Sequence, residues 1–343
     1  MADRNSSEFV KHVRGIALVA IFCLTAFAGV GCGSKSGTPS AGESATASAK
    51  PQTFATQDDA GKALYDAAKA NDTNALLRVF GTDARDLVIT GDPVDDKNGA
   101  AKFTASYEQM HRWDKLRNGD FVLTTGAANL PFPIPLAKNS AGQWFYDSTI
   151  AKDEILARRI GDNELGTMDS LLAMADAQEE YFAELHDGAT VQQYAQKFVS
   201  TPGKHDGLVW NVADGEPDSP LGPLAAKASA DGYTSSAEPF HGYLYRILTK
   251  QGEYSDGGAQ DYIVDGAMTG GYAILAYPAA YRNSGVMTFI VTSEGAIYQK
   301  DIGPTTAADA KAMNEVNLDS SWALVDDNED APQTAIAKVN DSK

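Results

Sequence analysis

Four short apolar segments follow one another in the second half of the chain, and their spacing constrains the fold more than any other feature. They are rich in aromatic and β-branched residues, as strands are, and span residues 243–250, 272–277, 286–291 and 296–300. No helical segment separates them, whereas parallel pairing needs a long crossover connection. We therefore predict a four-stranded antiparallel meander, with a glycine-containing turn at residues 292–295.

A long amphipathic segment precedes these strands. Across residues 164–184, apolar side chains recur at three- and four-residue spacing, which places them on one face of a helix. One helix packed across the sheet would cover the apolar face of each. We therefore expect a helix-plus-antiparallel-sheet domain of the α+β class over residues 161–325.

Residues 53–160 predict a separate α+β domain. Helices are expected at 57–69, 71–80 and 99–113, and strands at 86–90, 121–125, 132–136 and 143–147. This order loosely resembles the cone-shaped nuclear-transport-factor-2-like fold, which often holds an apolar pocket. In the alternative interpretation, Phe132, Trp144 and Tyr146 are ordinary core residues.

The first 31 residues have the pattern of a signal peptide. Arg4, Lys11 and Arg14 precede an apolar run at residues 15–31, and small residues end it. As a helix this run would span about 25 Å, which is less than the roughly 30 Å hydrocarbon core of a bilayer. A membrane-spanning anchor is therefore the alternative.

Cys32 follows directly and indicates a membrane anchor of another kind. Residues 29–34 resemble a bacterial lipobox, in which the cysteine is lipidated and becomes the new N-terminus, although Gly29 replaces the usual leucine. The resemblance implies an exported lipoprotein, on the periplasmic or outer-membrane face if the host is Gram-negative. The alternative is an incidental cysteine after an ordinary cleavage site. We expect residues 32–52 to be a flexible tether and residues 326–343 an acidic, disordered tail.

Charge and composition exclude several functional classes. The chain has 343 residues, of which 46 are acidic and 28 basic, giving a formal net charge of -18. This balance repels a phosphate backbone, so we expect no nucleic-acid partner. An apolar content of 43% is too high for a disordered protein. Cys23 and Cys32 are the only cysteines, so a disulfide scaffold is not expected.

The second half of the chain resembles a known group of domains. The segment 164–181, followed by the strand sequences at 241–247, 272–278 and 284–291, is similar to the globular heads of type IV pilins and pseudopilins. In those heads an amphipathic helix lies on a four-stranded antiparallel sheet. True pilins extend that helix into an apolar stem, whereas residues 151–163 are charged here.

The chain also resembles a family of uncharacterised bacterial lipoproteins, known only as a domain of unknown function. The residues that carry this resemblance are Ser-Pro-Leu-Gly-Pro-Leu at 219–224 and Gly-Tyr-x-Tyr-Arg-Ile-Leu at 242–248. The match extends over most of the chain after Cys32. It implies no known activity.

Signals of catalysis are sparse. The histidines have no paired metal-ligand spacing, and the chain contains no nucleophile elbow, Walker loop or dinucleotide fingerprint. His205 and His241 are candidates for ligand binding; the alternative is that they cap loops or pack at a domain seam. Arg246 lies among tyrosines on a predicted strand and is a candidate for binding a carboxylate, although stacking on the aromatic rings is the commoner use of such an arginine.

Two acidic loops have a spacing that would suit calcium. Alternate carboxylates converge on a hard cation in such loops, but a solvated loop is the alternative for both. No other cofactor is expected. The candidate ligands are Asp214, Glu216 and Asp218 in the first loop and Asp256, Asp261 and Asp265 in the second.

These observations favour a non-catalytic envelope lipoprotein that binds an envelope protein or polymer. One alternative is an envelope hydrolase that uses His205 or His241 with nearby acids, but the nucleophile motif is missing. Another is a pseudopilin-like component of a secretion or pilus system. The charged residues at 151–163 argue against that role.

Overall fold

The computed structural model describes residues 49–212 and 218–325. The described residues from Lys50 onward belong to one compact unit. The expected signal peptide, Cys32, most of the tether and the acidic tail lie outside the described residues. So do Asp214 and Glu216 of the first acidic loop.

The first part of the unit is helical, and polar side chains start its helices. α2 spans Gln57–Lys69, as predicted, because Thr56 and Asp59 form a reciprocal capping box. α3 spans Thr73–Phe80 and is capped by Asp72. The short η2 (Thr82–Ala84) and α4 (Arg85–Val88) follow, and then α5 (Pro93–Gln109).

Three local predictions in this part are wrong. The expected strand at 86–90 is the helix α4, because a short apolar run does not distinguish strand from helix. The expected strand at 132–136 is replaced by β3 (Leu130–Pro131) and β4 (Leu136–Lys138). Pro133 and Pro135 have no N–H to donate to a sheet ladder, which explains the interruption. The helix expected at 99–113 begins at Pro93, because Asp92 caps it, and it ends at Gln109, so that residues 111–113 belong to a strand.

The strands of this part form one antiparallel sheet. Its order is β1-β2-β4-β5, and β3 pairs with β2. β1 spans His111–Lys115, β2 Phe121–Thr125 and β5 Trp144–Tyr146. Trp144 and Tyr146 are buried in the core between sheet and helices, and Phe132 packs against that core. These three aromatic residues are therefore core residues.

The longest helix, α6, spans Lys152–Ala183 and starts earlier than predicted. The added turns carry charged, exposed side chains, including the Glu154–Arg158 pair at 2.6 Å. The expected domain boundary at residue 160 falls inside this helix. No helix among the described residues is both long enough and apolar enough to span a membrane.

The second sheet is the predicted antiparallel meander with one additional short strand. Its order is β14-β13-β12-β11-β6. The strands are β6 (Tyr243–Leu248), β11 (Ala273–Pro278), β12 (Thr288–Thr292), β13 (Ile297–Lys300) and β14 (Ala323–Leu324). The likeness to pilin heads, and that of the first part to the cone-like fold, stay predictions.

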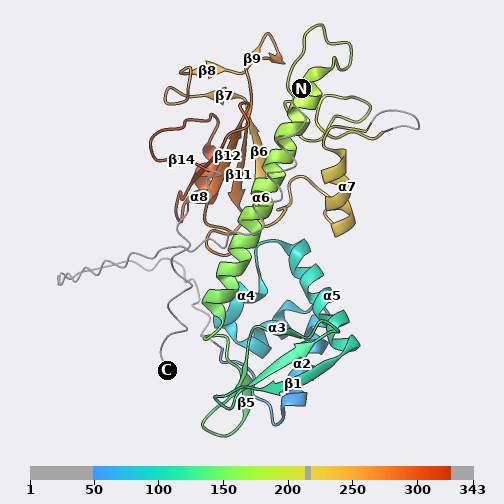
Figure 1. Ribbon diagram of the computed structural model, residues 1–343, viewed down its shortest axis with the longest axis vertical. Helices are drawn as coiled ribbons and strands as arrows, with labels where there is room; N and C mark the ends of the chain where they lie inside the picture. The colour runs from blue at the N-terminus through green and yellow to red at the C-terminus, as the bar shows by residue number, and fades with distance from the viewer. Residues whose placement is uncertain (1–48, 213–217, 326–343) are drawn as a thin grey trace, which may run out of the picture. The chain divides into compact units, whose positions relative to one another are not determined.

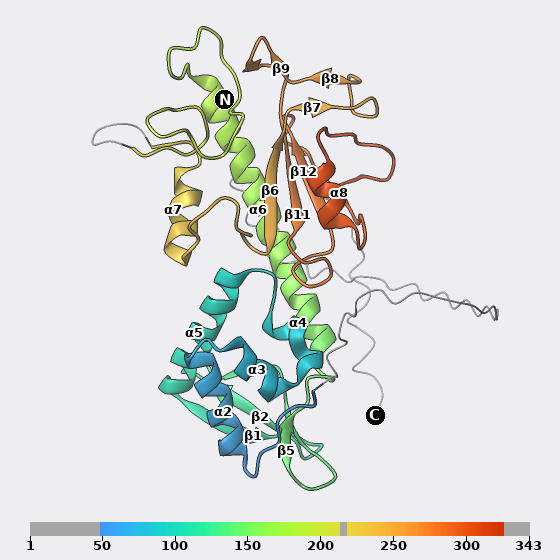
Figure 2. The ribbon, with the colours of Figure 1, turned by 180° about the vertical axis from the view of Figure 1, so that it is seen from behind.

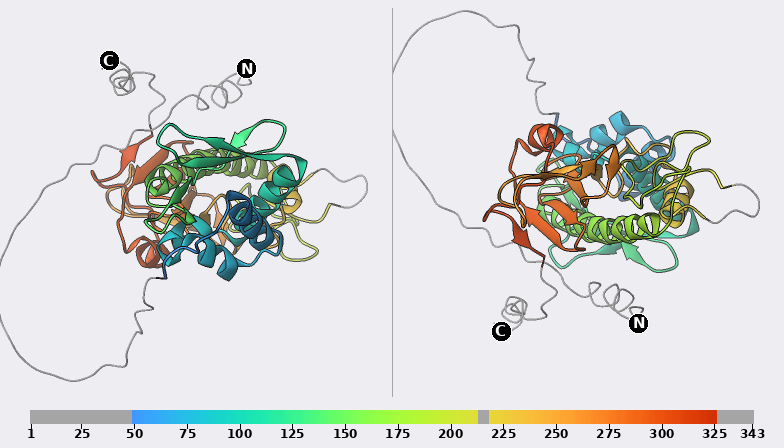
Figure 3. Two further views of the ribbon diagram at one scale, coloured as in Figure 1. Left: turned by 90° about the horizontal axis from the view of Figure 1, so that it is seen from below. Right: turned by 90° about the horizontal axis from the view of Figure 1, so that it is seen from above.

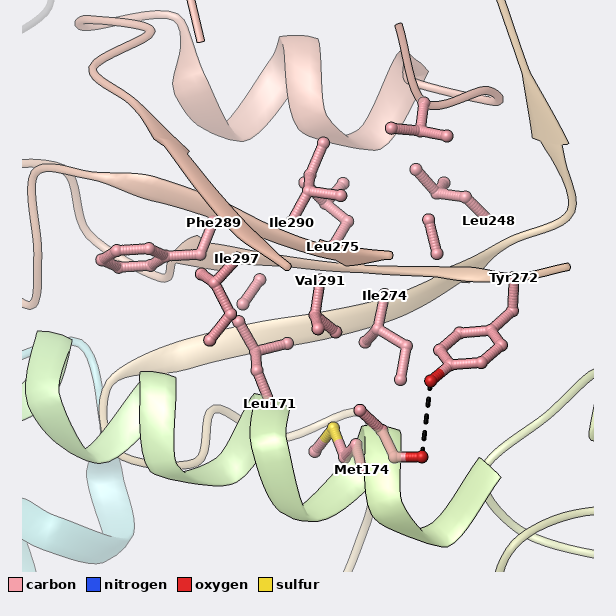
Figure 4. Close-up of a cluster of buried hydrophobic side chains, with 14 of the residues drawn as sticks. Leu171, Met174, Leu248, Tyr272, Ile274, Leu275, Phe289, Ile290, Val291 and Ile297 are labelled. Carbon is pink, nitrogen blue, oxygen red and sulfur yellow. Dashed lines mark hydrogen bonds between the residues drawn. The ribbon is translucent and has the colours of Figure 1, made fainter. Parts of the chain in front are cut away.

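Helices pack on both faces of this sheet. α6 contacts β11 and β12, and α8 (Thr306–Ala312) contacts β11, as Figures 1 and 2 show. The two views of Figure 3 also place α6 alongside the strands. In Figure 4, Ile274 and Val291 point toward α6, whereas Leu275 and Ile290 point toward α8. This alternation buries both faces, so β11 is apolar along its whole length.

Shorter elements connect α6 to this sheet and lie between its strands. α7 spans Gly222–Asp231. β7 (Lys250–Gln251) pairs with β8 (Gln260–Asp261), and β9 (Ile263–Val264) pairs with β10 (Ala267–Met268). Both small hairpins follow β6, and the β7–β8 hairpin contributes residues to the cavity described next.

Candidate functional site

A cavity of about 240 Å³ lies between the loop that follows β7 and the turn between β12 and β13. Tyr254, Tyr262 and Tyr298 contribute aromatic rings to it, and Asp256 and Glu294 contribute carboxylates. The remaining lining residues are Gln251, Ser255, Thr292, Ser293, Val316 and Leu318. The cavity therefore combines apolar ring surface with hydrogen-bonding groups, as small-molecule sites do.

The loop wall of the cavity is held by the segment that follows α8. The Gly252 N–H donates to the Val316 carbonyl at 2.8 Å, and the Ser255 hydroxyl donates to the same oxygen at 3.1 Å. The Tyr254 N–H donates to Asn317 Oδ1 at 2.9 Å. A Cβ at position 252 would lie 2.5 Å from Asn317 Cγ, so this close approach needs glycine. The wall is thereby fixed without any bound ligand.

Gln251 organises the base of the same loop. Its Nε2 donates to the carbonyls of Asp256 at 2.6 Å and Gly258 at 2.7 Å. Its Oε1 accepts a hydrogen bond of 2.8 Å from the Tyr262 hydroxyl. Burial, and to a smaller degree the charge of Glu294, raises the pKa of Tyr262 to about 12. Tyr262 is therefore a neutral donor at ordinary pH, and its ring is held in place.

The opposite wall is the predicted turn at residues 292–295. The Gly295 N–H donates to the Thr292 carbonyl at 2.9 Å, and Gly295 adopts a φ of 77°, which favours glycine. The Thr292 hydroxyl oxygen is buried and has no hydrogen-bond partner among the described residues. Glu294 lies exposed at the tip of the turn.

The electrostatics of the cavity are acidic. Asp256 and Glu294 take part in none of the salt bridges found among residues 49–212 and 218–325, and no lysine or arginine lines the cavity. Tyr254 is 62% exposed, so its ring is accessible to solvent. The site thus presents free acceptors and an accessible ring to a ligand.

Of the second predicted calcium loop, only Asp256 lines the cavity. The Asp261 carboxylate lies 3.4 Å from Lys250 Nζ, and Asp265 has a φ of 51° in the β9–β10 turn. Within the described part of the chain, no three His, Cys, Asp or Glu side chains form a group that could hold a metal ion. The structure therefore does not bring Asp256, Asp261 and Asp265 together as one group, and calcium binding by them stays a prediction.

Asp218 is the one residue of the first predicted calcium loop that the structure describes, and it is exposed. The prediction for Asp214, Glu216 and Asp218 as a set falls on residues outside the described part.

Arg246 is engaged within the fold. Its Nη1 donates to the carbonyls of Ala310 at 2.6 Å and Lys311 at 2.9 Å, in the last turn of α8. Carbonyls at a helix end lack partners in their own helix, so the guanidinium satisfies them. Arg246 was expected to stack on neighbouring tyrosines or to bind a carboxylate. In the structure its guanidinium instead donates to the end of α8 and holds that helix on the sheet.

The two candidate histidines lie in different surroundings, and neither lines the cavity. The His205 N–H donates to Asp187 Oδ2 at 2.8 Å, and its ring packs on Trp210 with 4.6 Å between centroids. His241 packs against Phe240, with 4.2 Å between ring centroids, and has a φ of 52°. Burial lowers the pKa of His241, so the imidazole is neutral at pH 7.

A buried polar cluster around Asp92 was missed by the sequence reasoning. Asp92 is 2% exposed, and its Oδ2 accepts from the Tyr233 hydroxyl at 2.8 Å and from the Gly242 N–H at 3.1 Å. Its Oδ1 caps α5 through the N–H groups of Val94 and Asp95. The Asp-Pro pair before a helix was the available signal for the cap. Nothing local indicated the partners at 233 and 242.

The neighbouring segments are joined by a second set of hydrogen bonds. Arg159 donates to the carbonyls of Asp86 at 2.7 Å and Leu87 at 3.1 Å, and to Asn283 Oδ1 at 2.6 Å. Asn283 in turn donates to the Ile89 carbonyl at 2.6 Å. These contacts explain why residues 85–89 do not enter a sheet: two of their carbonyls accept from Arg159, and another accepts from Asn283.

Comparison with known proteins adds the family. No curated protein matches the chain, and no solved structure does. The family described as "Protein of unknown function (DUF2950)" matches residues 51–325, which is most of the chain, and the protein therefore belongs to it.

Proposed function

We propose that this protein is an exported lipoprotein that binds a polar ligand of the cell envelope in the cavity between residues 251–258 and the 292–295 turn. The proposed binding role rests on the side chains of that cavity that are not engaged in contacts within the protein. Asp256 and Glu294 line the cavity and take part in none of the salt bridges found among the described residues, and Tyr254 is 62% exposed. They lie against a wall that is already fixed by hydrogen bonds, so little ordering is needed on binding.

The order of segments along the chain supports export and anchoring. A basic start, an apolar run and Cys32 precede a stretch without large apolar side chains, and the compact unit begins at Lys50. In this arrangement lipid on Cys32 holds the unit on a membrane surface.

The surroundings of the histidines support binding rather than hydrolysis. A general base must reach the proton it removes, and its partner must orient it. His205 and His241 instead pack on aromatic rings away from the cavity lining. Charged side chains in the first turns of α6, including Asp153 and Glu154, likewise argue against a pilin-like stem.

The anchor is tested by metabolic labelling. The full-length chain is expressed in a bacterium supplied with radioactive palmitate, together with Cys32→Ala and, as the matched control, Cys23→Ala. We expect label on the wild type and on Cys23→Ala and none on Cys32→Ala. Label that persists in Cys32→Ala would contradict the proposed anchor.

The binding role is tested with the lipidated protein in detergent, immobilised through a C-terminal tag. Soluble fragments of enzymatically digested cell envelope are passed over it, and the retained fragments are identified by mass spectrometry. We expect retention by the wild type and by Leu324→Ala, which removes an apolar side chain that is 53% exposed outside the cavity lining. Tyr254→Ala should lose retention. Equal retention by Tyr254→Ala, or none by the wild type, would refute the role of this cavity.

A further inference from the structure

We infer that His241 is a pH switch: when its imidazole gains a proton, the hydrogen bonds loosen by which Asp92 holds the start of α5 to the turn before β6. Neither residue lines the cavity, so this role is separate from the proposed binding function. The position of the imidazole, the hydrogen bonds of Asp92 and the charges around both residues support it.

The imidazole of His241 lies directly against the backbone of α6. Its Cγ is 3.3 Å from the position that a Cβ on Gly166 would take. It also packs on the Phe240 ring, with 4.2 Å between the ring centroids. His241 and Gly242 have positive φ values of 52° and 72°, so they form a tight turn that leads into β6. A displacement of the imidazole must therefore also disturb this turn.

The same turn is held by the buried carboxylate of Asp92. The Gly242 N–H donates to Asp92 Oδ2 at 3.1 Å, and the Tyr233 hydroxyl donates to the same oxygen at 2.8 Å. Asp92 Oδ1 accepts from the N–H groups of Val94 and Asp95, both at 3.1 Å. One carboxylate thus serves four donors, and it joins the first turn of α5 to groups 141 and 150 residues later in the chain.

A second proton on His241 would meet no free acceptor. In the described part of the chain no hydrogen bond to either ring nitrogen is found, and the ring contacts are with Phe240 and the α6 backbone. A protonated imidazole has two N–H donors, and its charge is unfavourable in a half-buried place without an acceptor. To pair with it, Asp92 would have to release Tyr233 or Gly242. Protonation therefore either leaves a charge unpaired or weakens the hydrogen bonds of Asp92.

Charged groups act on His241 from two further helices. Lys227 of α7 opposes a positive charge on the imidazole. Asp231 at the end of α7, together with Asp92 and Asp95 at the start of α5, favours such a charge. Burial has the largest effect, and it lowers the pKa of His241 below the ordinary value of 6.5. The closed arrangement therefore prefers the neutral imidazole.

Protonation favours the open arrangement below about pH 6.5. As the pH falls through this value, His241 takes up a proton more readily in a locally opened chain than in the closed one, so the closed arrangement loses stability. Burial raises the pKa values of the Asp95, Asp96 and Glu164 carboxyl groups, which therefore act in the opposite sense and at lower pH. The loosening should accordingly be seen between about pH 6.5 and about pH 5.

The test measures hydrogen exchange by mass spectrometry on the full chain in detergent. Amide exchange in peptides covering residues 93–96 and 240–244 reports the closed arrangement, after correction for the intrinsic effect of pH on exchange. We expect protection there to fall by roughly threefold to tenfold between about pH 7.5 and about pH 5.5. Exchange at the imidazole C2 position titrates each histidine separately in the same samples. We expect the midpoint for His241 to lie below 6.5.

Three substitutions assign the response to His241. His241→Asn removes the titrating group and keeps a residue that tolerates positive φ, so protection should no longer change between the two pH values. Lys227→Gln removes a repulsion and should move the titration of His241 to higher pH, whereas Asp231→Asn should move it to lower pH. Both of these side chains are largely exposed, so the fold should tolerate their substitution. His111→Gln, at an exposed histidine of β1, is the control and should respond as the wild type does.

Two results would overturn the switch. One is a titration midpoint of His241 at or above 6.5, and the other is a loss of protection that persists in His241→Asn. If His241→Asn does not fold, the other two variants decide: opposite shifts from Lys227→Gln and Asp231→Asn support the switch, and any other pattern contradicts it. None of these residues lines the cavity, so retention of envelope fragments tests the proposed function independently.

Discussion

The Asp92 cluster and the cavity are both polar, yet they differ in whether their polar groups have partners. Both oxygens of Asp92 accept hydrogen bonds, from Tyr233, Gly242 and the first turn of α5. In the cavity, the Asp256 and Glu294 carboxylates are exposed to solvent and take part in none of the salt bridges found among the described residues. A satisfied buried network stabilises a fold, whereas solvent-exposed polar groups around a cavity can exchange water for a ligand. The difference separates structural polar residues from candidates for binding.

Loss of the Asp92 carboxylate should have the largest effect. Asp92→Ala leaves four donors without their acceptor, two of them from distant segments, and we expect it to lower the free energy of unfolding by about 3 kcal/mol. Urea denaturation followed by circular dichroism measures this. Asp95→Ala, in the same turn, is the control and should change stability by less than about 0.5 kcal/mol. Similar losses of unfolding free energy in Asp92→Ala and Asp95→Ala would contradict the structural role assigned to Asp92.

Arg246 is expected to stabilise the fold through its hydrogen bonds, as Asp92 does. Arg246→Ala removes two charge-assisted hydrogen bonds to the end of α8 and should cost about 2 kcal/mol. Arg117→Ala, at an exposed arginine, should be neutral. Retention of envelope fragments should be unaffected in both. A stably folded Arg246→Ala protein that no longer binds them would move Arg246 to the binding class.

Tyr262 has features of both regions, because it lines the cavity and its hydroxyl also donates a hydrogen bond within the fold. Tyr262→Phe removes the bond to Gln251 and should cost about 1 kcal/mol at pH 8.

The same residue predicts a pH dependence. The pKa of Tyr262 is raised to about 12, mainly by burial, from an ordinary value of 10.0. Its contribution to stability is therefore complete below pH 10 and is lost as the pH rises from about 10 to 12, where the unfolded chain ionises first. Denaturant midpoints measured across this range should fall less steeply for Tyr262→Phe. Parallel curves would show that Tyr262 does not remain neutral in the fold.

The smallest change in stability is expected at Thr292. Thr292→Val removes a hydroxyl that has no partner and keeps the shape, so the free energy of unfolding should shift by less than about 0.5 kcal/mol. Retention of envelope fragments should not change either, because this oxygen has almost no accessible surface and cannot be reached from the cavity. Thr288→Val, which is equally unpartnered but outside the cavity lining, should be neutral in both measurements. A large loss of stability in Thr292→Val would reveal a structural partner and remove the distinction.

The fold was predictable where local chemistry decides it. The capping pair Thr56 and Asp59 set the start of α2, and the close spacing of the apolar segments led to the antiparallel meander. The strand expected at 86–90 failed because its carbonyls accept hydrogen bonds from Arg159 and Asn283, far away in sequence. Local propensity cannot include such partners.

The candidate site was much less predictable. Asp256 was among the acidic residues singled out, but as a calcium ligand, and Tyr254, Glu294 and Thr292 carried no signal of their own. The cavity brings together residues 251–262, 292–298 and 316–318, which adjoin only after the sheet has formed.

The sequence alone therefore determined the α+β class, the long helix and the meander, because each depends on neighbours within a few turns or strands. Only the tertiary structure decided which polar side chains have hydrogen-bond partners within the protein. Asp92, Arg246 and Ser255 find partners across long sequence separations, and the buried Thr292 hydroxyl finds none among the described residues. That decision depends on long-range packing, which periodicity and spacing do not encode.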